Sequence, residues 1–241
     1  TNESLRPQTI EEVYELSDSI LKNEHSEICK ELGDLLLHVV FYAKMGDEKG
    51  EFDIADVCNR LCEKLIYRHP HVFGEAKAAS AEDVMRNWEM LKTKEKDGNK
   101  RVLSGVPDSL PSMIKAYRIQ DKARGVGFDW EKKEDVWAKV KEEESELETE
   151  LNAIDAAVSD EEKAAAKDRA EEELGDMIFA LVNAGRLYKL NPDTALERTC
   201  AKFRRRFTYL EEHTIREGRD LHDMTLQEMD AIWDEAKEKG L

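Results

Sequence analysis

Apolar residues recur about every three or four positions along most of this chain, which is the spacing of one helix face. No segment shows the apolar–polar alternation of a half-buried strand, so we expect an all-α fold. Thr9, with Glu12 three residues later, has the capping-box pattern of a helix start. The spacing predicts helices over residues 10–22, 26–45, 54–67, 81–96, 113–123, 134–155, 161–190, 193–216 and 225–238.

Two features of the pattern suggest how these helices are organised. Residues 35–43 are apolar nearly all round, and we expect them to be buried on most sides. Glycine and proline mark residues 97–112 as a linker. This linker would separate two helical repeats, residues 1–96 and 113–241, each forming a four-helix unit.

The polar positions carry the same acidic pattern in both repeats. Each repeat has two glutamates three residues apart, followed on the next predicted helix by a Glu-x-x-Asp pair. Residues three apart lie on one helix face, one turn from each other. The two sets are Glu12, Glu15, Glu31 and Asp34 in the first repeat and Glu143, Glu146, Glu173 and Asp176 in the second, with Glu11 and Glu142 directly before them.

These carboxylates predict a metal site. Two facing helices would bring four carboxylates together, which is too much negative charge to bury without a cation. Hard oxygen ligands suit Mg²⁺ or Mn²⁺, and Mg²⁺ bound in this way usually meets a phosphate substrate. Gly33 and Gly175 lie between the paired acids, and a glycine inside a helix often marks the close approach of another helix or a ligand.

A pair of basic residues follows the acids in each repeat. Lys64 and Arg68 are four residues apart, as are Lys202 and Arg206, so each pair lies on one helix face. A phosphate substrate would need such cations, whereas a purely structural Mg²⁺ site would not. A catalytically weak nucleotide-binding or regulatory module with structural Mg²⁺ is therefore the second reading. A di-iron bundle is disfavoured, because it uses Glu-x-x-His motifs that neither repeat has.

Composition limits the partners. The chain has 37 Lys and Arg against 54 Asp and Glu, a net charge of −17, which argues against binding to nucleic acid or an anionic membrane. No apolar stretch approaches the length of a membrane span. The four cysteines form no Cys-x-x-Cys pair, so we expect free thiols in a cytoplasmic protein.

The order of these motifs resembles the all-α nucleoside triphosphate pyrophosphohydrolases, and among them the MazG branch with its two tandem copies. The resemblance covers nearly the whole chain, including Arg68–Phe73, Trp88–Lys92, Ser109–Pro111, Gly127–Trp130 and Lys202–Phe207. It implies Mg²⁺-dependent hydrolysis of a nucleoside triphosphate to the monophosphate and pyrophosphate, with Mn²⁺ able to replace Mg²⁺. It also implies broad base specificity and a house-cleaning role in the nucleotide pool.

The resemblance also implies residue roles. In the second repeat, the four acids would ligate the metal, and Glu142 would orient or deprotonate the water that attacks the α-phosphorus. Lys202 and Arg206 would neutralise the leaving pyrophosphate. Phe128 and Trp130 would line a base or ribose pocket, or else plug the core beside the preceding turn. The further nucleotide contacts expected are Lys92, which could instead be solvated, and Lys64 and Arg68 in the first repeat.

The first repeat departs from the family pattern. Family members carry a Cys-Pro-Trp-Asp segment ahead of the first acidic helix, and this sequence opens at Thr1–Pro7 without it. If that segment lines the first site, we expect the site to be incomplete. The resemblance also implies that the second repeat is the stronger catalytic unit, so we expect the main activity there. The first repeat would then be a weaker site or chiefly a dimerisation element. The long apolar helices would leave surface for a second copy, so we expect a homodimer.

Overall fold

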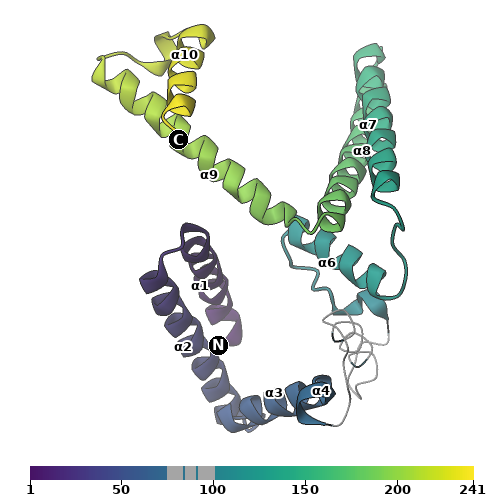
Figure 1. The fold of residues 1–241 in the computed structure, drawn as a ribbon, viewed down its shortest axis with the longest axis vertical. Coiled ribbons are helices and arrows are strands. Elements are labelled where there is room, and N and C mark those ends of the chain that lie inside the picture. The colour runs from purple at the N-terminus through teal and green to yellow at the C-terminus, as the bar shows by residue number, and fades with distance from the viewer. Residues whose placement is uncertain (75–83, 85–90, 92–100) are drawn as a thin grey trace. The chain divides into compact units, whose positions relative to one another are not determined.

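The computed structural model of the chain describes residues 1–74, 84, 91 and 101–241. This described part is helical and contains no β-strand, which confirms the predicted all-α class. The chain divides into two compact units, Thr1–Asn99 and Lys100–Leu241, drawn in Figure 1. Most of the predicted helix 81–96 lies outside the described residues. The division into two matching four-helix repeats remains a prediction.

The first unit is built on a helical hairpin. It contains α1 (Asn2–Lys22), α2 (His25–Lys49), α3 (Ile54–Arg68) and α4 (Pro70–Phe73). Helices α1 and α2 run side by side in opposite directions (Figure 1). Asn23 ends α1 in the left-handed conformation, at φ 60°, and this sharp turn lets α2 begin within three residues of the end of α1.

The start of α1 corrects the sequence prediction. The helix begins at Asn2 rather than residue 10, because Thr1 accepts a bond from the Ser4 amide at 3.2 Å and Ser4 returns the contact in a capping box. Thr9 lies inside the helix and is not its cap. Its hydroxyl donates to the Leu5 carbonyl at 3.1 Å and contacts the Tyr42 hydroxyl of α2 at 2.8 Å.

The apolar run 35–43 is only partly buried within the chain, contrary to expectation. Leu36 is 62% exposed and Val40 45% exposed. The reason is geometric: α2 has α1 as its main neighbour in the described unit, and one neighbouring helix can cover only one side of a cylinder. His38 and Ala43 lie on the covered side and are buried.

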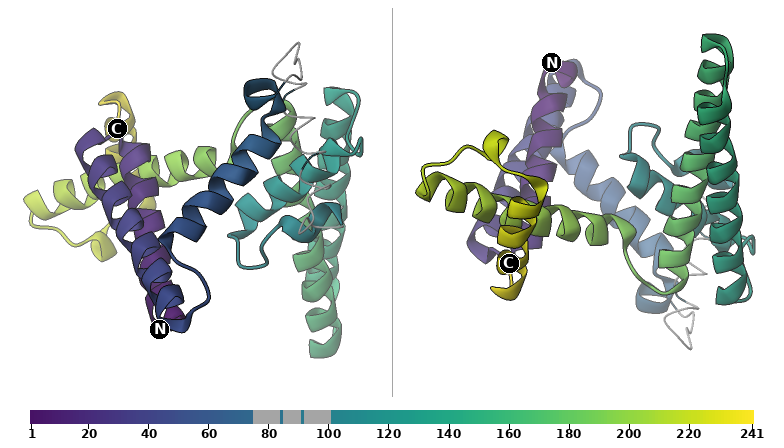
Figure 2. Two further views of the ribbon diagram at one scale, coloured as in Figure 1. Left: turned by 90° about the horizontal axis from the view of Figure 1, so that it is seen from below. Right: turned by 90° about the horizontal axis from the view of Figure 1, so that it is seen from above.

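The second unit contains a longer hairpin. Its elements are η1 (Val102–Gly105), α6 (Ser112–Gly125), α7 (Lys133–Ala156), α8 (Asp160–Leu187), α9 (Pro192–Arg216), η2 (Leu221–Asp223) and α10 (Leu226–Glu238). Figure 2 shows α7 and α8 side by side along most of their length. Ser159 caps α8 by accepting from the Glu162 amide at 3.1 Å, which makes the short turn between the two helices possible.

Small side chains allow the two helices of this hairpin to pack closely. Val136 and Val140 of α7 form a buried cluster with Ala180 and Ala184 of α8. A second cluster, formed by Leu210, Met224 and Ile232, attaches α10 to the C-terminal part of α9. Within the part of the chain that the structure describes, every helix is too short or too polar to span a bilayer.

Candidate active site

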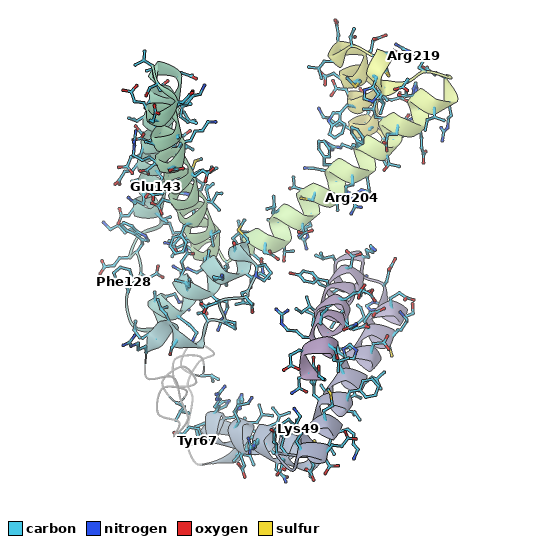
Figure 3. All side chains as sticks on the ribbon, turned by 180° about the vertical axis from the view of Figure 1, so that it is seen from behind. Lys49, Tyr67, Phe128, Glu143, Arg204 and Arg219 are labelled. Carbon is cyan, nitrogen blue, oxygen red and sulfur yellow. The ribbon has the colours of Figure 1, made fainter. Side chains whose placement is uncertain are left out.

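The paired acids of the second unit meet across the α7–α8 hairpin. Glu143 and Glu146 are one turn apart on α7, and Glu173 faces them from α8. One carboxylate oxygen from each of the three lies within 4.8 Å of the others. Glu143 is 5% exposed, while Glu173 is partly covered and Glu146 is open to solvent. Figure 3 labels Glu143 on this hairpin.

The charge of this cluster alters its protonation. Partial loss of solvent raises the pKa of Glu146 above its ordinary value, and the negative charges of Glu173 and Glu143 raise it further. Lys139 offsets part of this charge, because its Nζ lies 2.7 Å from Glu143 Oε1 and 2.9 Å from Glu142 Oε1. Lys139 is therefore the counter-ion closest to these carboxylates among the described contacts.

Two predicted acids lie at the edge of the cluster. Asp176 is one turn after Glu173 on α8, and it lines a cavity together with Glu143, although it is not one of the three closely grouped acids. Glu142 has a side chain that is 56% exposed and paired with Lys139. Asp176 is thus placed to join the cluster, whereas Glu142 faces the surrounding solvent.

The first unit has a corresponding acidic cluster. Oxygens of Glu12, Glu31 and Asp34 lie within 4.8 Å of one another across α1 and α2. Glu31 is 4% exposed, and its Oε2 has no hydrogen-bond partner among the described residues. Partial loss of solvent and the nearby charge of Glu31 raise the pKa of Glu15. Glu11 lies beside this group on the exposed surface of α1.

Both clusters suit a hard divalent cation. Their donors are carboxylate oxygens alone, which is the chemistry that Mg²⁺ and Mn²⁺ prefer. The unpartnered Glu31 Oε2 and the raised pKa values of Glu15 and Glu146 indicate negative charge that one lysine in each unit, Lys30 at 2.8 Å from Glu31 Oε1 and Lys139 beside Glu143, compensates only in part. Within the described part of this chain, Gly33 and Gly175 do not mark a close helix contact, since an added Cβ at either would meet no atom within 4 Å. Their role in the approach of a ligand stays a prediction.

A cavity of about 570 Å³ lies beside the acids of the second unit. Helices α6, α7 and α8 and the segment between α6 and α7 contribute to its lining. Phe128 and Trp130 lie along it but are not core plugs, because Phe128 is 82% exposed and Trp130 42% exposed. The cavity also reaches Glu143, Asp176 and Lys139, so it is continuous with the acidic cluster.

A buried ion pair holds the segment that carries these aromatics. Arg186 of α8 has a side chain that is 3% exposed, and its guanidinium pairs with both carboxylate oxygens of Asp129. Asn183 accepts from the same guanidinium at 2.7 Å. Asp129 lies between Phe128 and Trp130, so this pair anchors both aromatic residues to α8.

Of the predicted phosphate-binding cations, Lys202 and Arg206 of the second unit do not line the cavity beside the acids. Arg206 of α9 donates from Nε to the Leu241 carbonyl at 2.7 Å and lies over the Trp233 ring at 5.9 Å. Lys202 is exposed on α9. Lys64 and Arg68 lie on α3, and Lys92 lies outside the described residues.

Sequence reasoning missed several residues that line the cavity. Lys139 carries a readable signal, since it lies four residues before Glu143 on a predicted helix. Asp129 was visible only as part of the Gly127–Trp130 segment. The roles of Gln120 and Arg186 depend on contacts with segments more than fifty positions away, at separations of 59 and 57, which no local pattern reveals.

Sequence comparison with known proteins identifies the family of this chain. Residues 1–73 match the MazG nucleotide pyrophosphohydrolase domain. The chain is 37% identical to a nucleoside triphosphate pyrophosphohydrolase of Escherichia coli strain K12 over 240 residues, covering 99% of this chain and 88% of the relative. It is 39% identical to the nucleoside triphosphate pyrophosphohydrolase/pyrophosphatase MazG of Thermotoga maritima, covering 98% and 86%.

A third relative is longer. The chain is 43% identical to the uncharacterized protein YabN of Bacillus subtilis over 239 residues, which is 99% of this chain but 47% of that protein. The first two relatives, by contrast, match over most of their own length as well. This chain belongs to the MazG-type nucleoside triphosphate pyrophosphohydrolases.

Proposed function

We propose that this chain hydrolyses nucleoside triphosphates to nucleoside monophosphates and pyrophosphate in the presence of Mg²⁺, chiefly at the second unit. The observation that carries the proposal is the close grouping of Glu143, Glu146 and Glu173, with oxygens within 4.8 Å, beside a cavity of about 570 Å³. A cavity of that size can accept a nucleoside. The names of the Escherichia coli and Thermotoga maritima relatives support the same reaction.

The acids would have two roles in the attack on the α-phosphorus: binding the metal and activating the water. Glu143, Glu146, Glu173 and Asp176 would hold Mg²⁺, with Mn²⁺ as a substitute. Bound metal would supply positive charge to the triphosphate and lower the pKa of a water molecule. Glu142 would orient or deprotonate the attacking water, and for this it would have to exchange its contact with Lys139 for one with the water.

The cavity would hold the nucleoside. Phe128 and Trp130 offer exposed aromatic surface for a base or ribose. Lys139 would turn from Glu143 towards a phosphate oxygen once the metal neutralises that carboxylate. Lys202 and Arg206 remain proposed contacts of the leaving pyrophosphate, and α9 would have to approach the acids for them to act. Lys92, Lys64 and Arg68 remain proposed contacts as well.

We propose a homodimer in which the first unit is a weaker site or chiefly a dimerisation element. Large apolar side chains remain exposed on both hairpins, including Leu36 and Val40 on α2 and Ile178 on α8. A second copy could cover them. Sedimentation equilibrium would test this, with the 27.7 kDa chain as the monomer mass. Broad base specificity would fit a cytoplasmic house-cleaning role.

The decisive experiment determines which phosphorus atom of the triphosphate the water attacks. The protein is incubated with Mg²⁺, ¹⁸O-labelled water and each common NTP and dNTP. The products are separated by ion-exchange chromatography, and their masses are measured by mass spectrometry. Attack at the α-phosphorus places the label in the monophosphate. Glu146→Gln and Glu15→Gln are a matched pair, because they remove the corresponding carboxylate from each unit.

We expect monophosphate and pyrophosphate, with activity reduced at least 100-fold in Glu146→Gln and largely retained in Glu15→Gln. Diphosphate and phosphate as products would contradict the proposed reaction. The reverse pattern between the two variants would move the activity to the first unit. Tight Mg²⁺ binding without turnover would favour the regulatory module.

A further inference from the structure

Gln120 lines the cavity and carries a buried hydrogen-bond acceptor that no described residue uses. The residue lies on α6, is 5% exposed and lines the cavity. Its Nε2 donates to the Phe179 carbonyl of α8 at 2.8 Å. Its Oε1 is buried and has no partner among the residues the structure describes.

The orientation of this amide is determined by its neighbour. A backbone carbonyl can only accept, so the amide nitrogen must face Phe179 and the oxygen must face away from it. Buried side-chain acceptors in folded proteins nearly always have a partner. An acceptor without one, on a residue that lines a cavity, can be satisfied by an ordered water or by a donor that a ligand brings.

The cavity itself suggests which part of a nucleotide meets Gln120. The acids Glu143 and Asp176 mark the end that would face metal and phosphates. Much of the remaining wall is apolar or aromatic, with contributions from Ile119, Phe128 and Phe179. Such a wall suits a planar base, whose polar edge then needs only a few directed hydrogen bonds.

We propose that Gln120 is a specificity-determining residue, whose Oε1 accepts a hydrogen bond from the exocyclic amino group of the nucleobase. The inference rests on the proposed function, since it requires the nucleotide to enter this cavity. Adenine and cytosine carry such a group, at their 6- and 4-positions respectively. Guanine, hypoxanthine and uracil present a carbonyl oxygen at the corresponding position, which would face another acceptor. One neutral hydrogen bond makes this a graded preference within broad specificity.

The test compares two substrates that differ in the amino group. Conversion to monophosphate is measured for ATP and for purine riboside 5′-triphosphate, which lacks only that group. The proteins are wild type, Gln120→Leu, the similarly sized Gln120→Met, and Gln227→Leu as a control on the exposed surface of α10. Each result is the ratio of kcat/KM for the two substrates within one preparation, so a loss of folded protein cancels.

We expect wild type and Gln227→Leu to prefer ATP by roughly tenfold, and both Gln120 variants to lower this ratio to about one. Equal kcat/KM for the two substrates in wild type would overturn the inference while leaving the proposed function intact. A ratio unchanged by both Gln120 substitutions would also overturn it. Failure of wild type to convert either nucleotide would overturn the proposed function, and the inference with it.

Discussion

Lys139 lies one helical turn before Glu143 on α7, and its Nζ is 2.7 Å from Glu143 Oε1. Hydrogen bonds to Glu143 and Glu142 raise the pKa of Lys139 well above its ordinary value, so the ammonium stays charged. Glu143 has a side chain that is only 7% exposed. The lysine therefore occupies the position of a counter-ion beside a buried carboxylate that the proposed reaction requires for Mg²⁺.

Replacing this lysine should have opposite effects on the metal-free and metal-bound protein. In Lys139→Met, Glu143 loses its counter-ion, and we expect the metal-free protein to lose about 1 kcal/mol, a modest value because Lys139 is 36% exposed and screened by water. In this variant Mg²⁺ no longer competes with the ammonium for Glu143. The Mg²⁺ concentration that gives half of the maximal stabilisation should therefore fall roughly fivefold. Thermal denaturation across a Mg²⁺ titration measures both, with exposed Lys141→Met as the control. A higher Mg²⁺ midpoint in Lys139→Met would contradict the competition.

The raised pKa of Glu146 makes stability depend on pH with a definite sign. The folded protein holds this proton above the ordinary pKa of 4.5, so the metal-free protein should lose stability as pH rises from 4.5 through the raised pKa. The stability of Glu146→Gln should decline less steeply over this pH range. With saturating Mg²⁺, the stability of the wild-type protein should instead increase with pH. Melting temperatures from pH 4 to 8 test this, with exposed Glu148→Gln as the control. A decline equally steep in Glu146→Gln would exclude this carboxylate as its source.

The Asp129–Arg186 pair should be important for both folding and catalysis. Asp129→Asn would leave a guanidinium that is 3% exposed without its anion, and we expect a loss of about 2–4 kcal/mol in the free energy of unfolding. The exposed neighbour Glu131→Gln should change it by less than about 0.5 kcal/mol. Urea denaturation gives both values.

The same substitution should raise KM more than it lowers kcat. The reason is that Asp129 positions Phe128 and Trp130 at the cavity, while the acids on α7 and α8 keep their own support. Steady-state kinetics under conditions where the variant is fully folded separate the two constants. An unchanged KM would mean that the anchored aromatics do not contact the substrate.

A local motif in α10 predicts acid sensitivity of the C-terminal helices. Glu228 accepts from the Thr225 amide at 2.8 Å and from Arg219 at 2.7 Å, and these bonds lower its pKa to about 2. Its contribution to stability is therefore full above the ordinary value of 4.5 and is lost as pH falls towards 2. Glu228→Gln should lower the melting temperature at pH 7, and the difference from wild type should shrink on acidification. Exposed Asp230→Asn is the control; a difference that does not change with pH would rule out the ionised form as the stabilising one.

Helix boundaries in the described part of the chain follow mostly from local sequence, and the largest error among them has a local cause. Helices predicted over 54–67 and 193–216 occur at Ile54–Arg68 and Pro192–Arg216. The start of α1 was placed eight residues too late, because the Thr9 pattern was taken for the cap that Thr1 and Ser4 in fact form. The sequence of this segment contains two capping patterns, and choosing between them requires knowing which residues pack against other helices. Thr9 packs against Tyr42 of α2, a contact that the local sequence does not reveal.

Local spacing in the sequence predicts three of the four acids of each repeat that lie close together in the structure. Spacing of three residues on α7 puts Glu143 and Glu146 on one face, and a short capped turn lets Glu173 return beside them. The surroundings of those acids, in contrast, depend on packing between segments that are distant in sequence. Gln120 meets Phe179, and Asp129 meets Arg186, across 59 and 57 positions of sequence. Helix periodicity records which face a residue occupies, but it carries no information about which distant segment packs against that face, and that packing forms the cavity.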